Sequence, residues 1–307
     1  MEVDRFTGKV VGLLGLGVFA AWIFGYEFRV WFSSPTIGEF SALLVLTAFF
    51  LTVFTVTSFA IKGVQVMAAG VILQIAAVWA SLDGKFSVFT LIGLGTLFVF
   101  LVAGFVRGRS DILNSVKIRF FRISYRMVTV ATTGFVLFFV FYLVGSLNLS
   151  QTNFHRGTID FLLGISESAT ENIIPGFSRD KSIDDVLRAF IRAKAPAGMT
   201  EAEIQLNIVT MKEEIRKATG FRLDGRERFS EALYELTVAK FSTLAPAYQT
   251  LMIIFAGIVI FGFVKGLAFF LNIIVVLLAF VAYQTLIALN IITVRLESAN
   301  REVITVE

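Results

Sequence analysis

The chain has 307 residues, of which 56% are hydrophobic and only 16% are charged, and its formal net charge is +4. Soluble domains carry about 25% charged and about 45–50% apolar residues, so this composition excludes a water-soluble globule. The absence of cysteine excludes disulfides, thiolate zinc sites, iron–sulfur clusters and cysteine nucleophiles. A single histidine excludes a multi-histidine metal site. Phosphate-loop and dinucleotide fingerprints are absent as well, so we expect no cofactor.

Seven stretches of the chain could cross a membrane. A spanning helix needs about 20 predominantly apolar residues, and these windows meet or approach that length without a charged residue or histidine. They are Val10–Tyr26, Phe40–Ile61, Val64–Ala80, Phe86–Val106, Met127–Leu147, Ala247–Val264 and Leu267–Val294. The predicted fold is therefore an all-α, polytopic transmembrane bundle of about seven spans, with five of them in residues 1–147.

The last two windows form one apolar region, residues 247–294, interrupted by a single charge at Lys265. One helix over this whole region would be about 72 Å long, whereas the bilayer core is about 30 Å thick. We therefore predict a transmembrane hairpin that turns at Gly262–Gly266, where glycine permits the bend and Lys265 reaches the headgroups. Residues 295–307 would follow as a polar C-terminal tail.

A small helical domain is predicted between spans five and six, over residues 148–246. Helix-start signals and apolar stripes recur there at helical spacing. They predict a helix over Thr158–Thr170 and a second over Ile183–Ala193, which Ser182 opens together with Asp185 three residues later. A third helix starts at a capping box of Thr200 and Glu203 and ends at Gly220, and a fourth starts near Arg228. The domain is nearly neutral, which argues against a nucleic-acid partner.

Residues 107–126 carry a net charge of +5, with six basic residues against the single acid Asp111. The positive-inside rule places this segment in the cytoplasm. Alternation then gives an integral protein of the plasma or inner membrane with a cytoplasmic N-terminus. Domain 148–246 and the tail 295–307 would both be extracytoplasmic.

The same basic segment carries an amphipathic pattern. Ser110 can cap a helix over Asp111–Arg126, on which the three residues of one face are Arg119, Arg122 and Arg126. Such a helix is typical of a segment that contacts anionic lipid headgroups. The alternative is that these charges only set the orientation of the chain. The expected partner of this segment is the anionic surface of the bilayer.

The predicted spans contain no acid or base, which excludes a voltage sensor and argues against transport through a buried carboxylate. Asn272, Tyr283 and Asn290 fall within one stripe of the last span. They could line a pore or make hydrogen bonds between helices of an oligomer, and the second reading is favoured. Four-residue spacings of small residues, at Gly17, Ala21 and Gly25 and again at Gly262 and Gly266, are also typical of close helix contacts.

Two functions fit these patterns. The favoured one is a non-enzymatic, oligomeric assembly or scaffold subunit that acts through its outer helical domain. The alternative is a passive oligomeric ion channel or pore lined by uncharged polar residues. An enzyme is not expected, because the sequence offers no nucleophile–base pair and no metal-ligand set.

Overall fold

The computed structural model describes residues 2–33, 36–82, 87–115, 118–146, 163, 167, 171, 177–194, 199–297 and 301–306. The chain divides into two compact units. We call them the membrane unit, comprising Met1–Ser33, Gly38–Ser146 and Ile253–Glu307, and the polar unit, comprising Ser34–Ile37 and Leu147–Met252.

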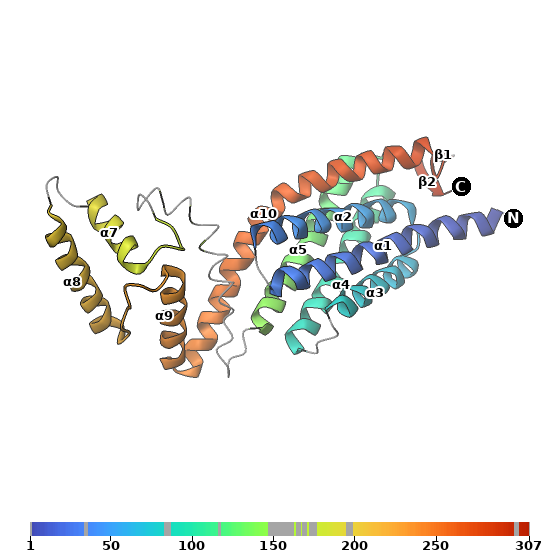
Figure 1. The fold of residues 1–307 in the computed structure, drawn as a ribbon. Helices are drawn as coiled ribbons and strands as arrows, with labels where there is room; N and C mark the ends of the chain where they lie inside the picture. Colours follow the sequence, from blue (N-terminus) through green and yellow to red (C-terminus); the bar gives the residue numbers. More distant parts are fainter. Residues whose placement is uncertain are drawn as a thin grey trace. The chain divides into compact units, whose positions relative to one another are not determined.

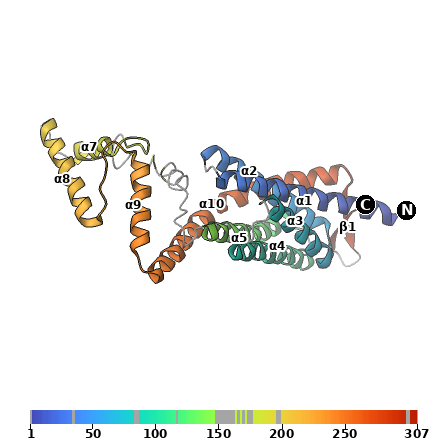
Figure 2. The same cartoon turned by 60° about the horizontal axis from the view of Figure 1, so that its bottom comes forward.

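Six helices in the described part of the chain are long and apolar enough to cross a membrane, which indicates an integral membrane protein. They are α1 (Glu2–Ser33), α2 (Ile37–Ala60), α3 (Val64–Ser81), α4 (Val88–Leu113), α5 (Phe120–Ser146) and α10 (Pro246–Ala288) (Figures 1 and 2). The first five correspond to the first five predicted spans. The prediction of a helical membrane protein is thus confirmed.

The predicted turn at Gly262–Gly266 is wrong, because α10 is one continuous helix of 43 residues. The described chain therefore has six candidate spans in place of seven. Apolar helix-forming residues flank both glycines. A glycine inside a helix lowers the stability of the helix by only about 1 kcal/mol relative to alanine. Length alone was a poor guide, since a helix of this size, about 65 Å, can extend beyond the bilayer core.

The C-terminal segment forms a two-stranded antiparallel hairpin, which the sequence reading missed. Strand β1 (Ile292–Glu297) pairs with β2 (Arg301–Val306), with Ile292 opposite Val306. The Lys9 ammonium donates to the Asn290 carbonyl oxygen at 3.4 Å. The start of α1 and the end of α10 therefore lie at the same end of the membrane unit (Figure 1).

Glycines allow close packing inside the membrane unit, where α4 runs along α5 and α1 along α3. A Cβ atom placed on Gly104 of α4 would lie 3.0 Å from the Met127 carbonyl oxygen of α5. One placed on Gly25 of α1 would lie 3.0 Å from the Val78 carbonyl oxygen of α3. The first of the two predicted small-residue faces is therefore used within the chain.

Phenylalanines fill the space between α1, α2 and α5. The rings of Phe24 and Phe135 are 5.1 Å apart and nearly perpendicular, and Phe50 lies 5.2 Å from Phe135. Phe28 and Phe138 form a further pair at 5.2 Å. Each such pair contributes about 0.5–1.5 kcal/mol beyond area burial, so these rings hold α1 and α2 against α5.

The polar unit contains α7 (Ile183–Lys194), α8 (Glu201–Thr219) and α9 (Phe229–Thr243). The predicted capping box of Thr200 and Glu203 is present, and α8 ends at Gly220 in the left-handed conformation, with φ 74°. An apolar cluster of Ile191, Ile204 and Ile208 joins α7 to α8. Most of the predicted helix over residues 158–170 lies outside the described residues.

An even number of candidate spans leads to a test of sidedness. Between Ser115 and Ser182 lies one candidate span, α5, and between Ser182 and Thr305 lies one more, α10. In cells, an impermeant maleimide should label Ser115→Cys and Thr305→Cys from one side and Ser182→Cys from the other. Labelling of Thr305→Cys from the same side as Ser182→Cys would contradict a single crossing by α10 and would favour the turn at Gly262–Gly266.

Candidate functional site

Hydrogen-bonding groups meet between α5 and α10, inside long apolar stretches of both helices. We call this set the polar seam; its members are Thr129, Thr132, Thr133, Lys265 and Asn272. The Thr132 hydroxyl donates to the Asn272 side-chain oxygen at 2.6 Å, and both residues are buried. Buried polar groups in an apolar layer need such partners within the protein. The contact therefore favours one relative placement of α5 and α10.

Lys265 is the second element of the seam. Its ammonium donates to the Thr133 hydroxyl at 2.5 Å and to the Thr129 carbonyl oxygen at 3.3 Å. Thr133 lies in the middle of α5, so the charge sits beside the centre of an apolar helix. The expectation that Lys265 reaches the headgroups from a turn is thus wrong, since no turn exists and α5 supplies its partners. An ionisable residue at such a position is unusual and needs these hydrogen bonds.

The seam holds helices together and offers little chemistry. It contains one cation, hydroxyls and an amide, without a carboxylate or histidine to act as a base. Across the described residues, no cluster of three or more His, Cys, Asp or Glu side chains could hold a metal ion. What the seam can do is fix the rotation of α10 about its own axis.

The three polar residues predicted on the last span do not line one surface. Asn272 faces α5, and so does Tyr283, which is 5% exposed and stacks on Phe120 with ring centres 4.8 Å apart. Asn290 lies beyond the end of α10 with φ 54° and is exposed. The sequence reading missed Lys265 as a site residue, although it is the only charge in its long apolar window.

The predicted amphipathic helix over Asp111–Arg126 is also wrong. Its first residues continue α4 as far as Leu113, and its last residues begin α5 at Phe120. Two apolar residues of this segment that repeat at helical spacing, Ile112 and Phe120, are buried on different helices, the first on α4 and the second on α5. Two helix ends that pack against each other therefore mimic a single amphipathic helix.

The three predicted headgroup-contacting arginines have different surroundings. Arg126 lies 3.4 Å from the Asp111 carboxylate, in a contact that is largely open to solvent. Arg119 and Arg122 are exposed, and Arg122 lies one turn before Arg126 on α5. Arg122 and Arg126 thus share one side of the first turns of α5.

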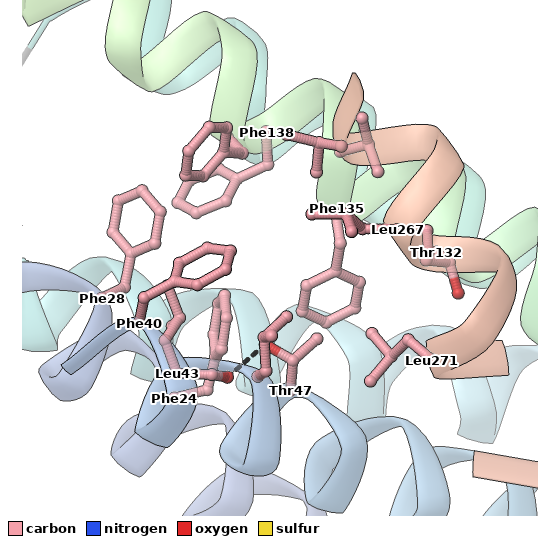
Figure 3. A pocket seen from close by; sticks show the side chains of 15 residues that line it. Phe24, Phe28, Phe40, Leu43, Thr47, Thr132, Phe135, Phe138, Leu267 and Leu271 are labelled. Atoms are coloured by element: carbon pink, nitrogen blue, oxygen red, sulfur yellow. Dashed lines mark hydrogen bonds between the residues drawn. The ribbon is translucent and has the colours of Figure 1, made fainter. Parts of the chain in front are cut away.

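A Phe-rich pocket of about 70 Å³ lies beside the seam, between α1, α2, α5 and α10 (Figure 3). Its polar atoms are essentially two hydroxyls, those of Thr47 and Thr132, and the Thr47 hydroxyl donates to the Leu43 carbonyl oxygen of its own helix at 2.7 Å. Small-molecule sites usually measure about 300–1,000 Å³. This pocket is therefore a packing gap among rings and not a substrate site.

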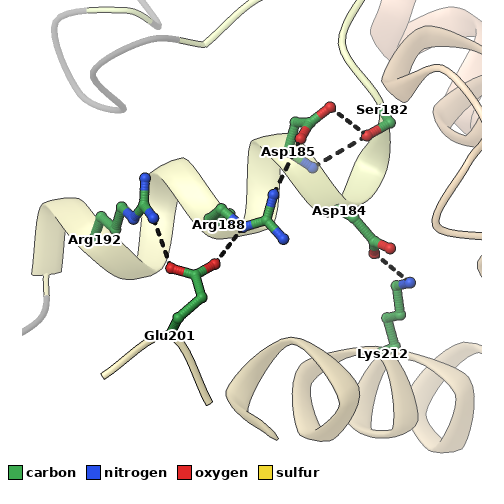
Figure 4. A network of polar contacts seen from close by, with 7 residues as sticks. All are labelled: Ser182, Asp184, Asp185, Arg188, Arg192, Glu201 and Lys212. Carbon is green, nitrogen blue, oxygen red and sulfur yellow. Dashed lines mark hydrogen bonds and ion pairs between the residues drawn. The ribbon is translucent and has the colours of Figure 1, made fainter. Parts of the chain in front are cut away.

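Ion pairs connect α7 to α8 in the polar unit (Figure 4). Glu201 accepts from Arg192 at 2.7 Å and lies 3.1 Å from Arg188, and Lys212 pairs with Asp184. Exposed pairs of this kind contribute only about 0–1 kcal/mol each. The network aligns two helices and has no catalytic arrangement.

No known family model, curated protein or solved structure matches this chain significantly.

The capping box makes α8 sensitive to acid. The Thr200 backbone N–H, and then its hydroxyl, donate to the Glu203 carboxylate and lower its pKa below the ordinary value of 4.5. Because the pKa of Glu203 is lower in the folded state, its ionised carboxylate stabilises the helix fully at pH values above the ordinary pKa of 4.5. This stabilisation is lost as the pH falls through the folded-state pKa. At neutral pH the first turn of α8 should exchange amide hydrogens faster in Glu203→Gln than in the wild type.

Hydrogen-exchange mass spectrometry from about pH 6 to about pH 3 should show that difference vanish. Glu214→Gln, on the same helix but away from the cap, should match the wild type throughout. A difference between wild type and Glu203→Gln that persists unchanged in acid would contradict the charged cap.

A double-mutant cycle tests the seam. Thr132→Val and Asn272→Leu each remove one partner of the buried hydrogen bond. Coupling energies between polar side chains in membrane proteins average about 0.6 kcal/mol and reach about 1.7 kcal/mol. We expect a coupling in that range from unfolding in mixed micelles, whereas additive single effects would show that the bond does not join the helices.

Proposed function

We propose that this chain is a non-enzymatic subunit of an oligomeric membrane assembly, in which α10 contacts a second copy. The observation that carries the proposal is the outward face of α10. Phe255, Ile258 and Phe270 are 68%, 63% and 65% exposed, and lie on the side of the helix opposite the packed residues.

Two glycines in the middle of this face distinguish it from an ordinary lipid-facing surface. Gly262 and Gly266 are exposed, four residues apart, and a Cβ atom on either would meet nothing within 4 Å. Exposed apolar side chains alone can pack against lipid tails and need no protein partner. A pair of small residues, in contrast, lets the backbone of another helix approach closely. We define the glycine face as Phe255, Ile258, Val259, Gly262, Gly266 and Phe270.

The polar seam supports the same proposal. Because Asn272 and Lys265 bond to α5, α10 cannot easily rotate to bury its glycines within the chain. A second copy that presented the same face would form a symmetric contact, the commonest kind in homo-oligomers. Lys265 would lie at the edge of this contact, with one of its three N–H donors beyond the two bonds to α5.

The orientation that fits the proposal follows the positive-inside rule. The basic segment 107–126 and the N-terminus face the cytoplasm, and the polar unit is extracytoplasmic, where it can contact partners. Six crossings support a cytoplasmic C-terminal hairpin, in place of the outer position expected from seven.

A passive pore receives less support from the same residues. Asn272 and Tyr283 already serve contacts between α5 or α2 and α10. A pore lined by them would require these contacts to be exchanged for water. The assembly subunit needs no such rearrangement.

Substitution of the glycines tests the proposal. Gly262→Val/Gly266→Val places branched side chains in the proposed contact, so the dissociation constant in vesicles, measured by energy transfer on dilution into lipid, should rise at least about tenfold. The matched control is Gly12→Val/Gly15→Val on α1. These glycines are also exposed, and a Cβ atom on either would have no other atom within 4 Å. A wild type that stays monomeric at every lipid dilution would refute the assembly, and an equal loss in both variants would refute the assigned face.

A further inference from the structure

A second surface, at the basic end of α5, has the chemistry of a lipid site. An open groove of about 410 Å³ runs between α5 and α10. Its lining consists of Phe121, Arg122, Tyr125 and Arg126 on α5, and Ile273, Val276 and Leu277 on α10. The volume lies within the range of small-molecule sites, about 300–1,000 Å³.

The two walls of the groove differ in character. The α5 wall presents two guanidinium groups one helical turn apart, at Arg122 and Arg126, with the Tyr125 ring between them in sequence. The α10 wall is wholly apolar, and Ile273 and Leu277 on it are 41% and 52% exposed. A molecule that fills the groove must therefore carry negative charge at one part and hydrocarbon at another.

The charge of the arginines is not balanced within the chain. Arg126 shares its charge with Asp111 at 3.4 Å, a distance longer than that of a tight ion pair. Arg122 is exposed and makes no ion pair with any residue that the structure describes. Two cations against one acid leave a net positive groove.

The groove lies at the charged end of α5. Arg126 is the last charged residue of α5, and residues 127–146 after it are uncharged. The arginines thus lie where an apolar span begins, which is the depth of lipid phosphates, while α10 remains apolar beside them. Tyrosine is enriched at the same depth.

We propose that this groove binds one anionic glycerophospholipid, with its phosphate on Arg122 and Arg126 and an acyl chain on Ile273 and Leu277. A guanidinium group can donate two parallel hydrogen bonds to the oxygens of one phosphate. The apolar α10 wall would contact the acyl chain in the place of a neighbouring lipid. The site does not depend on the glycine face, which lies on other residues of α10.

Titration of the purified 307-residue chain in detergent with phosphatidylglycerol, followed by native mass spectrometry, tests the site. Arg122→Gln/Arg126→Gln should weaken binding at least about tenfold, since each basic residue at a membrane surface contributes a several-fold effect. Arg119→Gln removes the same kind of charge from outside the groove and should change the affinity less than about threefold. An equal loss of lipid affinity in the two variants would show that binding depends only on general surface charge, and would overturn the proposal.

The apolar wall has its own matched pair. Ile273→Trp fills the groove without a change of charge and should weaken binding of phosphatidylglycerol, whereas Ile274→Trp, exposed on the same helix but outside the lining, should not. These two variants keep the test decisive if the arginine double variant fails to fold. Unchanged binding in Ile273→Trp would contradict the assigned groove.

Two further ligands separate headgroup from chain. Phosphatidylcholine with the same acyl chains should bind more weakly because its phosphate charge is neutralised by the choline, and glycerol 3-phosphate should not bind measurably because it lacks chains. Equal binding of phosphatidylcholine would overturn the requirement for an anionic lipid. Saturable binding of glycerol 3-phosphate would show a phosphate site and not a lipid site.

Discussion

The structure depends on the need of polar groups in an apolar layer to find their hydrogen bonds within the protein. Helix α10 is nearly uniform in hydrophobicity around its circumference, so burial alone gives it little preference for one rotation. Lys265 and Asn272 supply that preference, because their partners Thr133 and Thr132 all lie on α5. In lipid, where association of apolar surfaces gives little driving force, such bonds and close packing decide which faces meet.

Once the rotation is set, the outward residues of α10 follow from helical periodicity. The face toward α5 holds small and buried residues such as Gly257 and Ala268, whereas Gly262 and Gly266 point away from it. The same rotation places Ile273 and Leu277 beside Arg122 and Arg126. One seam thus accounts for two outer surfaces, the glycine face and the basic groove, which the described part of the chain leaves exposed.

Between the other membrane helices, most of the contacts described above come from shape, and the Arg126–Asp111 pair between α5 and α4 is a polar exception. Hydroxyls such as those of Thr55 and Ser58 donate to carbonyls of their own helix at 2.7 Å, which satisfies them without joining neighbours. Contacts between helices come from glycine spacing at α4–α5 and α1–α3 and from edge-to-face and tilted phenylalanine pairs. The polar unit uses a third means, in which caps and exposed ion pairs orient helices around a small isoleucine cluster.

Local signals in the sequence predicted the parts of the fold that depend on local chemistry. The apolar windows identified α1 to α5, and the capping box at Thr200 identified α8, because neither depends on distant residues. The turn at Gly262–Gly266 failed because a single lysine was read as a boundary, while its partners on α5 lie more than 130 residues away. The helix over Asp111–Arg126 failed for a related reason, since buried residues on two adjoining helices repeat at the spacing of one. Of the site residues, Asn272 was recognised as polar, but its role required its neighbour Thr132 to be known.

The most direct test of the account is a cysteine scan along α10. The chain has no native cysteine, so single cysteines from Ile254 to Phe270 can be oxidised in native membranes without background. Disulfide-linked dimers should peak at Phe255, Ile258 or Val259, Gly262, Gly266 and Phe270, following the helical period, with minima at Gly257 and Ala268. A flat profile, or maxima on the side that faces α5, would contradict both the rotation fixed by the seam and the contact between copies.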